Sequence, residues 1–392
     1  MMIGGMAALA SPVRVRAAKR PSLAPRAIAM WDFSWLERRW PGGGYEDWDA
    51  ALDALVDRGY DAVRVDAYPH LMLAGPEQER TLHRWGDLAW GSPGRVVVRI
   101  MPALTDFIAA CSRRGVKVAL SSWYRRDDAE LRLCLGDPRR MAEAWIAVLA
   151  AVERAGLLDS ILFVDLCNEF PGPDWAAFLS PRLDWGDWPD PRALAYIRVA
   201  LDGVRVAYPR LPICFSSDRD EVADYRRADL PPIDLIEHHI WMAKENGKAF
   251  ERATAARTPE GEWLDRVAFA AEPLYRTRRA EWDAALSRKI AALAQVSRAT
   301  DLPLASTEGW AIVSLRDWPM LDWRWVKDVC AVGVHAAAAS GRFLAICTSN
   351  FCGPQIAGMW RDVGWHRELT GVIKNAGIDA DLMDSLLYQM LQ

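Results

Sequence analysis

The hydrophobic positions of the chain follow two alternating patterns. Short runs of branched and aliphatic residues, such as AIAMWDF from Ala27, alternate with longer segments whose apolar residues recur every three or four positions. In the segment 45–58, for example, Trp48, Leu52 and Leu55 fall on one helical face, and Gly59 follows where a helix commonly ends. Strands alternating with amphipathic helices are typical of a parallel sheet covered by helices.

Eight strands and their helices can be placed from this pattern. The strands are predicted at 27–33, 61–68, 116–124, 161–167, 211–217, 233–241, 302–307 and 342–350. The main helices are predicted at 45–58, 101–114, 138–154, 191–208, 280–298 and 322–339, with two helical stretches after the last strand. We expect a long irregular insertion at about 242–278, after the sixth strand.

Eight such units predict an α/β fold of the (β/α)8 TIM barrel type, as a single domain with elaborated βα loops. The predicted barrel covers 25–392, and 1–24 is predicted to be a flexible tail. A doubly wound open sheet is the alternative, and it would normally carry a glycine-rich phosphate loop after the first strand. The PGGG stretch here lies several residues beyond that strand and lacks the GxGxxG spacing, so we interpret it as a turn.

Composition narrows the range of partners. The formal net charge is −4 and arginine is interleaved with acidic residues, which argues against a nucleic-acid partner. No run of 18 apolar residues occurs, so we expect no membrane span. The seven cysteines are irregularly spaced without a CxxC pair, which favours buried free thiols over disulfides or a metal site. Basic residues follow the apolar N-terminal stretch, the reverse of a secretory signal. We therefore expect a cytoplasmic protein without metal or cofactor, whose oligomeric state the sequence does not indicate.

Polar residues that could take part in catalysis or binding lie at the ends of several predicted strands. In a barrel of this type the carboxyl ends of the strands form the active site. Arg64 lies in the second strand, Asn168 and Glu169 follow the fourth, and Glu308 follows the seventh. The sixth strand ends in EHHIW, and because side chains alternate along a strand, only one of its two histidines should face the site.

These motifs resemble a clan of (β/α)8 retaining glycosidases that includes the cellulases and β-glucosidases, and most closely its cellulase-like members, some of them described as sugar-binding. VDLCNEFPG resembles the acid/base motif of the clan, and LASTEGW resembles its nucleophile motif. The resemblance implies that Glu169 is the acid/base and Glu308 the nucleophile in cleavage of a β-linked carbohydrate substrate. It further implies that Arg64, Asn168 and His239 contact the substrate or support the pair.

The proposed reaction has clear physical requirements. Retaining hydrolysis needs two carboxyl groups about 5–5.5 Å apart, one to attack the anomeric carbon and one to protonate the leaving oxygen. The acid must be protonated and the nucleophile ionised, and an arginine beside Glu308 is expected to keep that carboxylate anionic. Asn168 is expected to hydrogen-bond the sugar 2-hydroxyl, a contact that strengthens in the transition state.

The chain departs from the clan at several positions, which leaves the substrate open. Trp241 replaces the usual tyrosine of the sixth strand, and Trp123 stands after two serines where the third strand usually ends in histidine. Asn350 stands near the place of the usual tryptophan after the eighth strand. We include these three residues as substrate-binding candidates, together with Trp310, Asp66 and Tyr68, which also follow strand ends. The tryptophans in loop-like segments, which offer flat faces for sugar rings, are Trp85, Trp90, Trp175, Trp185, Trp188, Trp310 and Trp318.

Other interpretations stay open at this point. Glu169 has a structural alternative as an ion-pair partner of Arg64, and Asp165, Glu237 and Glu272 are rival carboxylates. Besides a glycoside hydrolase, the sequence allows a cellulase-like barrel that holds sugar without cleaving it, or a barrel with other carboxylate chemistry such as a lyase or transglycosidase. The tryptophan-rich loops are compatible with a closed pocket or with an open cleft.

Overall fold

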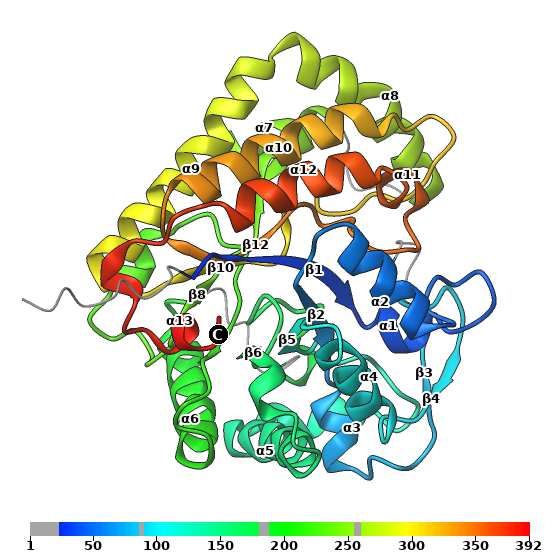
Figure 1. The fold of residues 1–392 in the computed structure, drawn as a ribbon, viewed down its shortest axis with the longest axis vertical. Helices are drawn as coiled ribbons and strands as arrows, with labels where there is room; N and C mark the ends of the chain where they lie inside the picture. The colour runs from blue at the N-terminus through cyan, green and yellow to red at the C-terminus, as the bar shows by residue number, and fades with distance from the viewer. Residues whose placement is uncertain (1–22, 86–89, 180–187, 255–259) are drawn as a thin grey trace, which may run out of the picture.

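The computed structural model describes residues 23–85, 90–179, 188–254 and 260–392. Its main feature is a parallel sheet whose strands lie in the order β7-β6-β5-β2-β1-β12-β10-β8 (Figure 1). These strands are β1 (Arg26–Asp32), β2 (Ala62–Asp66), β5 (Lys117–Ser121), β6 (Ile161–Asp165), β7 (Ile213–Cys214), β8 (Ile236–Glu237), β10 (Leu304–Ser306) and β12 (Phe343–Cys347).

The two outer strands of this sheet meet and close it. A parallel bridge joins Ser217, just past β7, to His238, just past β8. The Ser217 N–H donates to the Glu237 carbonyl at 3.2 Å, and the His239 N–H donates to the Ser217 carbonyl at 2.8 Å. The sheet is therefore a nearly closed barrel of eight strands alternating with helices, which confirms the predicted TIM barrel.

Helices surround the barrel, and two small sheets extend its rim. The helices are α1 (Ser34–Glu37), α2 (Trp48–Asp57), α3 (Pro69–Leu73), α4 (Ala103–Ser112), α5 (Pro138–Arg154), α6 (Pro191–Ala207), α7 (Glu245–Thr254), α8 (Glu260–Thr277), α9 (Arg279–Thr300), α10 (Trp323–Ala339), α11 (Ala357–Trp360), α12 (Val363–Lys374) and α13 (Leu386–Gln389). The small sheets pair β3 (Arg80–Leu82) with β4 (Val96–Val98) and β9 (Ile240–Trp241) with β11 (Gly309–Trp310).

Aspartates begin several of the long helices. The side chains of Asp137, Asp190 and Asp322 each accept a hydrogen bond from a backbone N–H in the first turn, at the starts of α5, α6 and α10. Such caps satisfy amides that have no partner within the helix. Pro138 and Pro191 occupy the first positions of α5 and α6, where a missing N–H loses nothing. The observed helix starts therefore lie close to the predicted ones.

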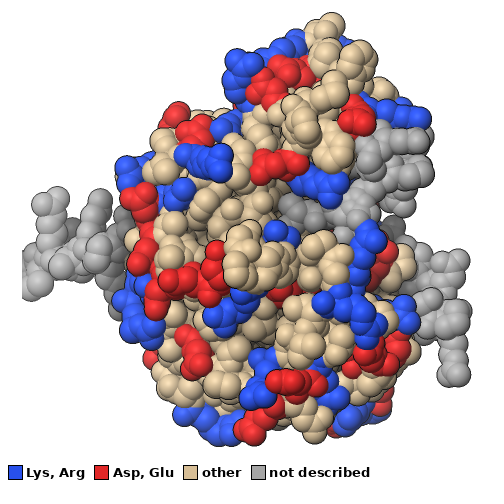
Figure 2. All heavy atoms as spheres, turned by 90° about the vertical axis from the view of Figure 1, so that its right-hand side faces the viewer, with Lys and Arg blue, Asp and Glu red and all other residues tan. Residues whose placement is uncertain are grey.

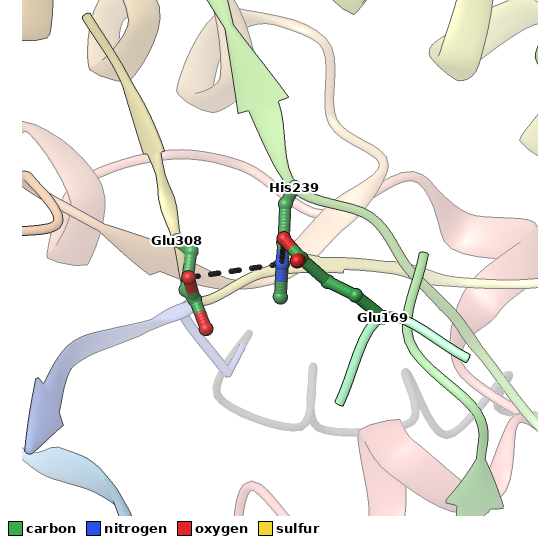
Figure 3. A group of neighbouring side chains, drawn as sticks. All are labelled: Glu169, His239 and Glu308. Carbon is green, nitrogen blue, oxygen red and sulfur yellow. Dashed lines mark hydrogen bonds and ion pairs between the residues drawn. The ribbon is translucent and has the colours of Figure 1, made fainter. Parts of the chain in front are cut away.

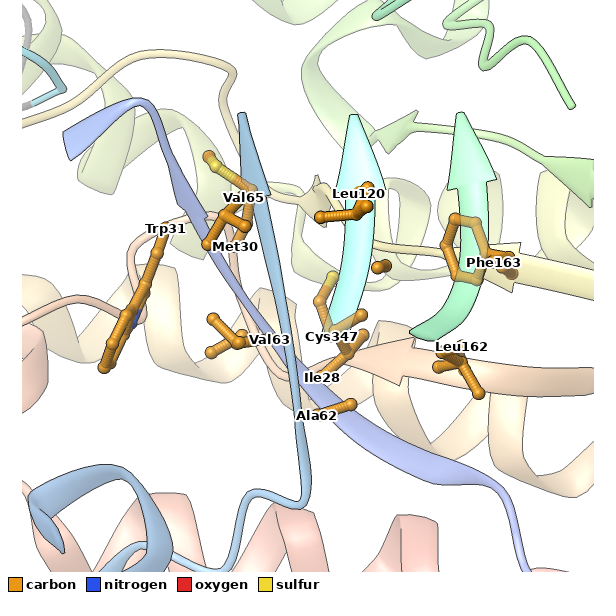
Figure 4. Packing of buried hydrophobic residues seen from close by; sticks show 14 of the residues in the cluster. Ile28, Met30, Trp31, Ala62, Val63, Val65, Leu120, Leu162, Phe163 and Cys347 are labelled. Carbon is orange, nitrogen blue, oxygen red and sulfur yellow. The ribbon is translucent and has the colours of Figure 1, made fainter. Parts of the chain in front are cut away.

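The barrel strands are buried on both faces. Every residue of β2, β6 and β12 is buried, which explains why these strands are nearly continuous apolar runs in the sequence. Figure 4 shows part of this packing, with Ile28, Val63, Leu120 and Phe163 from four strands. All four of these side chains are fully buried. Against this background, a charged residue such as Arg64 in β2 requires a specific explanation.

The structure differs from the sequence prediction in two segments. The insertion after the sixth strand is helical rather than irregular, because it forms α7 and α8. Strands five and six are much shorter than predicted, and among the described residues a 3-10 turn (Ala223–Arg226), with no α-helix, connects them. The predicted flexible tail at 1–24 lies almost entirely outside the described residues.

Figure 2 looks onto the side of the molecule toward which β1 points in Figure 1. Acidic and basic side chains are interspersed on this face and form no large patch of one sign. All seven cysteines are free, and Cys134 alone among them is exposed. Across the described residues, no helix combines the length and the apolar character needed to cross a bilayer.

Candidate active site

A buried arginine joins three strands at the mouth of the barrel. The Arg64 side chain is fully buried, and its Nη2 donates to Asp165 at 2.6 Å and to Asn168 at 2.8 Å. Its Nη1 donates to Glu308 at 2.9 Å and to Thr307 at 3.0 Å. These acceptors satisfy the Nη donors of the buried guanidinium, whereas its Nε has no partner among the described residues. Arg64 therefore fixes the ends of β6 and β10 relative to β2.

Glu169 follows β6 in a constrained backbone conformation. Its φ is +44°, and its N–H donates to the Ser216 hydroxyl at 2.9 Å. Its carboxylate accepts a hydrogen bond from His239 Nδ1 at 2.8 Å and another from the Trp175 indole at 3.2 Å. A left-handed backbone is strained for a glutamate, and the surrounding bonds hold the side chain in the barrel mouth.

His239 lies between the two predicted catalytic carboxylates, as Figure 3 shows. Its Nδ1 is 2.8 Å from Glu169 and 3.8 Å from Glu308, and its Nε2 is 2.9 Å from Glu237. Burial disfavours the charged imidazole, but the carboxylates of Glu237 and Glu308 raise the pKa of His239 well above its ordinary value. His238 points elsewhere, with its Nδ1 3.2 Å from the Tyr225 hydroxyl, in agreement with strand alternation.

The two carboxylates approach each other closely. One oxygen of Glu169, one nitrogen of His239 and one oxygen of Glu308 all lie within 4.8 Å of one another. Such a trio resembles a metal-ligand set, but both ring nitrogens of His239 face carboxylates and carry protons in the cationic form. A protonated imidazole has no lone pair for a metal. The donor set therefore suits a hydrogen-bonded ion cluster better than a metal ion.

The protonation of the pair is the reverse of what the sequence leads one to expect. Burial, with the nearby charges of Glu169 and Glu237, raises the pKa of Glu308 to about 7, although His239 and Arg64 oppose this shift. Burial acts in the same direction on Glu169, but the hydrogen bond and charge of His239 outweigh it and lower that pKa to about 2. The physical reason is position, because His239 contacts Glu169 directly and lies farther from Glu308. Arg64 acts on Glu308 in the expected direction, because its charge lowers the pKa of that carboxyl group, but burial and the neighbouring carboxylates outweigh it.

A pocket of about 380 Å³ opens above the two carboxylates. Aromatic residues from several loops form much of its lining, and Trp85 and Trp175 stack on each other with centroids 4.8 Å apart. Trp123 also lines the pocket, and its ring lies 4.6 Å from the Arg64 guanidinium. Lys244 and Asp218 form an ion pair on the side of the pocket near Glu169. The site therefore combines carboxylates with flat apolar faces.

Two predicted binding residues after the second strand have structural partners instead. Asp66 accepts hydrogen bonds from the backbone N–H groups of Tyr68 at 2.7 Å and Trp123 at 3.0 Å. The Tyr68 hydroxyl donates to the Phe33 carbonyl at 3.1 Å. Both side chains are fully buried, and neither lines the pocket. They shape the loops around the site rather than facing a ligand.

Besides Arg64, Asn168 and His239, which lie buried beneath the pocket, three further candidates lie outside its lining. Trp310 donates to the Cys347 carbonyl at 3.0 Å and faces Gly333 of α10, away from the barrel mouth. Trp241 is buried and lines no part of the pocket. Asn350 donates to the Val313 carbonyl at 2.7 Å and so positions a residue that does line it. The short pairing of β9 with β11 carries both tryptophans away from the site.

The loop tryptophans divide into two groups. Trp85, Trp90 and Trp175 line the pocket, where their flat faces could contact a sugar ring. Trp188 instead packs edge-on against Tyr225, and Trp318 donates to Asp265. Trp185 lies outside the described residues.

Sequence reasoning missed several polar residues of the pocket, among them Asp32, Asp218 and Lys244. Glu237, considered as a rival carboxylate, lies outside the pocket lining and is an ion-pair partner of His239. Asp32 was detectable, because it ends the first strand in the same way that Glu169 and Glu308 follow theirs. Lys244 could not be identified from the sequence, because it belongs to the segment predicted to be irregular.

Comparison with known proteins identifies the family and supports the description of the fold. The family model "Cellulase-like: Sugar-binding cellulase-like" matches residues 28–374. A crystal structure from Parabacteroides distasonis, described as that of a candidate glycoside hydrolase, is 43% identical with a TM-score of 0.90, and the match covers 94% of this chain and 99% of that one. No functionally curated protein sequence matches the chain.

More distant structures share the fold alone. Cel5A of Thermotoga maritima, solved with mannotriose, is 13% identical with a TM-score of 0.51, and the match covers 88% of this chain and 97% of that one. A glycoside hydrolase family 5 mannosidase from Rhizomucor miehei is 10% identical with a TM-score of 0.52, and 95% of each chain is covered. Since the family model spans nearly the whole barrel and the relative from P. distasonis matches along its full length, the chain belongs to the sugar-binding cellulase-like family.

Proposed function

We propose that this protein is a retaining β-glycoside hydrolase with Glu169 as acid/base and Glu308 as nucleophile. The observation that carries the proposal is the approach of the two carboxyl groups, whose nearest oxygens lie within 4.8 Å. Retaining enzymes hold their carboxyl groups about 5–5.5 Å apart, whereas inverting enzymes need about 6.5–9.5 Å to admit a water molecule. The description of the 43% identical relative as a candidate glycoside hydrolase supports the same reaction class.

In the first step, a Glu308 carboxylate oxygen attacks the anomeric carbon and the bond to the leaving oxygen breaks. Glu169 gives its proton to that oxygen, and a covalent glycosyl ester forms on Glu308. Arg64 donates to Glu308 at 2.9 Å and stabilises its ionised form. In the second step, ionised Glu169 takes a proton from water, and the water oxygen attacks the anomeric carbon and releases Glu308.

His239 links the protonation states of the two groups. The first step requires the proton on Glu169 and not on Glu308, and the unliganded site favours the opposite arrangement. The Nδ1–H of His239 already lies on a Glu169 oxygen, and the same Nδ1 lies 3.8 Å from Glu308. Transfer of the Nδ1 proton to Glu169, together with transfer of the Glu308 proton to Nδ1, makes Glu169 neutral and ionises Glu308 while His239 stays cationic. A cationic His239 is thus a local proton source for the acid step.

The direct test is the hydrolysis of p-nitrophenyl β-glycosides by Glu308→Ala and Glu169→Ala variants. We expect Glu308→Ala to lose activity by several orders of magnitude and to regain part of it with azide, which occupies the vacated space and attacks in place of the carboxylate. Activity that survives Glu308→Ala would exclude this mechanism. Product stereochemistry, followed by NMR, should show retention.

The family description also allows a barrel that holds sugar without cleaving it. Titration calorimetry of the intact protein with the same glycosides, followed by product analysis, separates the two functions. Binding without any product over long incubation would favour the binding function, whereas product release at an appreciable rate would exclude it.

A further inference from the structure

A third carboxyl group enters the pocket from the first strand. Asp32 is the last residue of β1, where the register with β2 shifts between Met30 and Asp32. Its φ is +41°, a left-handed conformation that aspartate tolerates better than most residues. The side chain is 1% exposed and lines the same pocket as Glu308.

The two oxygens of this carboxyl group differ in their partners. Oδ1 accepts a hydrogen bond from the Ser34 N–H. Oδ2 is buried and has no hydrogen-bond partner among the described residues. Two neighbouring buried carboxylates have arginine partners, since Glu37 binds Arg125 through both oxygens and Glu308 binds Arg64 through one. Asp32 has no arginine partner among the described residues.

An unpartnered buried acceptor is unfavourable unless a ligand completes it. Such a group has lost its hydrogen bonds to water and gained none in return. Burial also raises the pKa of Asp32 well above its ordinary value, and the negative charges of Glu37 and Glu308 contribute. A donor that arrives with a bound molecule would satisfy Oδ2 and favour the ionised carboxylate over the neutral acid, and sugar hydroxyls are such donors.

The position of Asp32 decides which part of a glycoside it meets. Glu169 protonates the leaving oxygen, so the leaving group lies on the side of Glu169 and Lys244, whereas the sugar ring under attack lies over Glu308. Asp32 and Glu308 line the same pocket, and the charge of Glu308 contributes to the raised pKa of Asp32. It shares the pocket lining with Phe33 and Trp90, whose flat faces suit the C–H faces of a sugar ring.

Resting on the proposed function, we propose that Asp32 contacts the glycone directly and that its free Oδ2 accepts a hydrogen bond from a ring hydroxyl. Asp32 is then a specificity-determining residue for the sugar that is released. The glycone is uncharged at this position, because a hexuronic acid would bring a second carboxylate against a buried carboxyl group that has no cationic partner among the described residues.

The test compares Asp32→Gly and Asp32→Asn with the intact protein. Glycine adopts positive φ without strain, so Asp32→Gly removes the carboxyl group without straining the backbone. Asp32→Asn retains the oxygen that faces Ser34 and replaces Oδ2 with an N–H donor. Glu79→Gln, at an exposed carboxylate paired with Arg99, is the control for loss of one negative charge elsewhere. Thermal melting checks that each variant folds.

Activity is measured on p-nitrophenyl β-glycosides, on the monodeoxy analogues of the best substrate and on its hexuronide. We expect kcat/KM to fall about 100-fold in Asp32→Gly and about 10-fold in Asp32→Asn, as for the loss or weakening of a hydrogen bond to a charged group. One monodeoxy analogue should be about 100-fold poorer for the intact protein, yet equal to the parent glycoside for Asp32→Gly. The hexuronide should be rejected.

Two results overturn the proposal and are distinguishable from failure of the proposed function. If the intact protein hydrolyses glycosides but Asp32→Gly stays within 3-fold of it, Asp32 does not contact the glycone. The same conclusion follows if every monodeoxy analogue loses the same factor in both proteins. If the intact protein hydrolyses no glycoside, the proposed function itself fails and this inference fails with it.

Discussion

At the scale of single residues, the site is a cluster in which two cations separate four buried carboxylates. Arg64 lies between Asp165 and Glu308, and His239 lies between Glu169 and Glu237. Arg64 donates charge-assisted hydrogen bonds to Asp165 and Glu308, and His239 donates one to Glu169. Because the carboxylates also act on one another, the Glu169–Glu308 pair titrates as a unit.

The pH dependence of activity follows from this coupling. The reactive form of the enzyme carries one proton on the Glu169–Glu308 pair. That proton is lost as the pH rises through about 7, the pKa of Glu308. A second proton binds only near pH 2, the pKa of Glu169. We expect kcat/KM to be nearly constant in mildly acidic solution and to fall about tenfold per pH unit above about 7. Initial rates across pH 4–10 measure this, and a rate that rises through pH 7 would contradict it.

At the scale of secondary-structure elements, the packing of α10 against β11 determines where Trp310 lies. An added Cβ at Gly333 of α10 would lie 2.4 Å from the indole of Trp310, so the helix approaches the ring as closely as only glycine allows. The indole N–H also donates to the Cys347 carbonyl in β12. Trp310 is therefore part of the framework that carries Glu308, two residues earlier in the chain.

Replacing Gly333 with alanine tests this packing. Although alanine favours helices, the contact with Trp310 should make Gly333→Ala destabilising by about 1–3 kcal/mol in the free energy of unfolding. Denaturant titration measures the change. The matched control is Gly371→Ala on α12, where an added Cβ meets nothing within 4 Å, and we expect it to stabilise the protein by about 0.5–1 kcal/mol. Equal effects of the two substitutions would refute the explanation.

At the scale of the whole molecule, the barrel is unevenly closed. The pairing of β2 with β5 runs over five residue pairs, from Ala62 with Lys117 to Asp66 with Ser121. Among the described residues, the seam between β7 and β8 consists of the bridge between Ser217 and His238 and three backbone hydrogen bonds. Because His239 follows directly after this seam, the most sparsely paired part of the barrel lies beside the proposed catalytic pair.

Amide hydrogen exchange should reveal this difference. We expect the amides of Ser217 and His239 to exchange about 10–100 times faster than those of β5, because opening the seam breaks few hydrogen bonds. Exchange followed by mass spectrometry on peptides that cover both regions measures the ratio. Equal protection would mean that the barrel opens only as a unit.

Much of the architecture was predictable because local patterns encode it. The buried strands are apolar runs, the caps Asp137 and Asp322 precede amphipathic segments, and parallel strands place their carboxyl ends on one rim. Because Arg64, Glu169, His239 and Glu308 lie in or directly after predicted strands, they could be predicted to lie at that rim. The directions of Trp241 and Trp310 did not, because a short extra pairing beyond the barrel turns both away from the site.

The sequence by itself determined the barrel and the four strand-end motifs, because hydrophobic periodicity and residue order are local properties of the chain. Only the tertiary structure decided the protonation of the pair, since the pKa of Glu308 depends on burial and on the distance of His239 from each carboxylate. It likewise decided that Asp32 has a free oxygen in the pocket and Asp66 does not, because hydrogen-bond satisfaction depends on neighbours far apart in the chain.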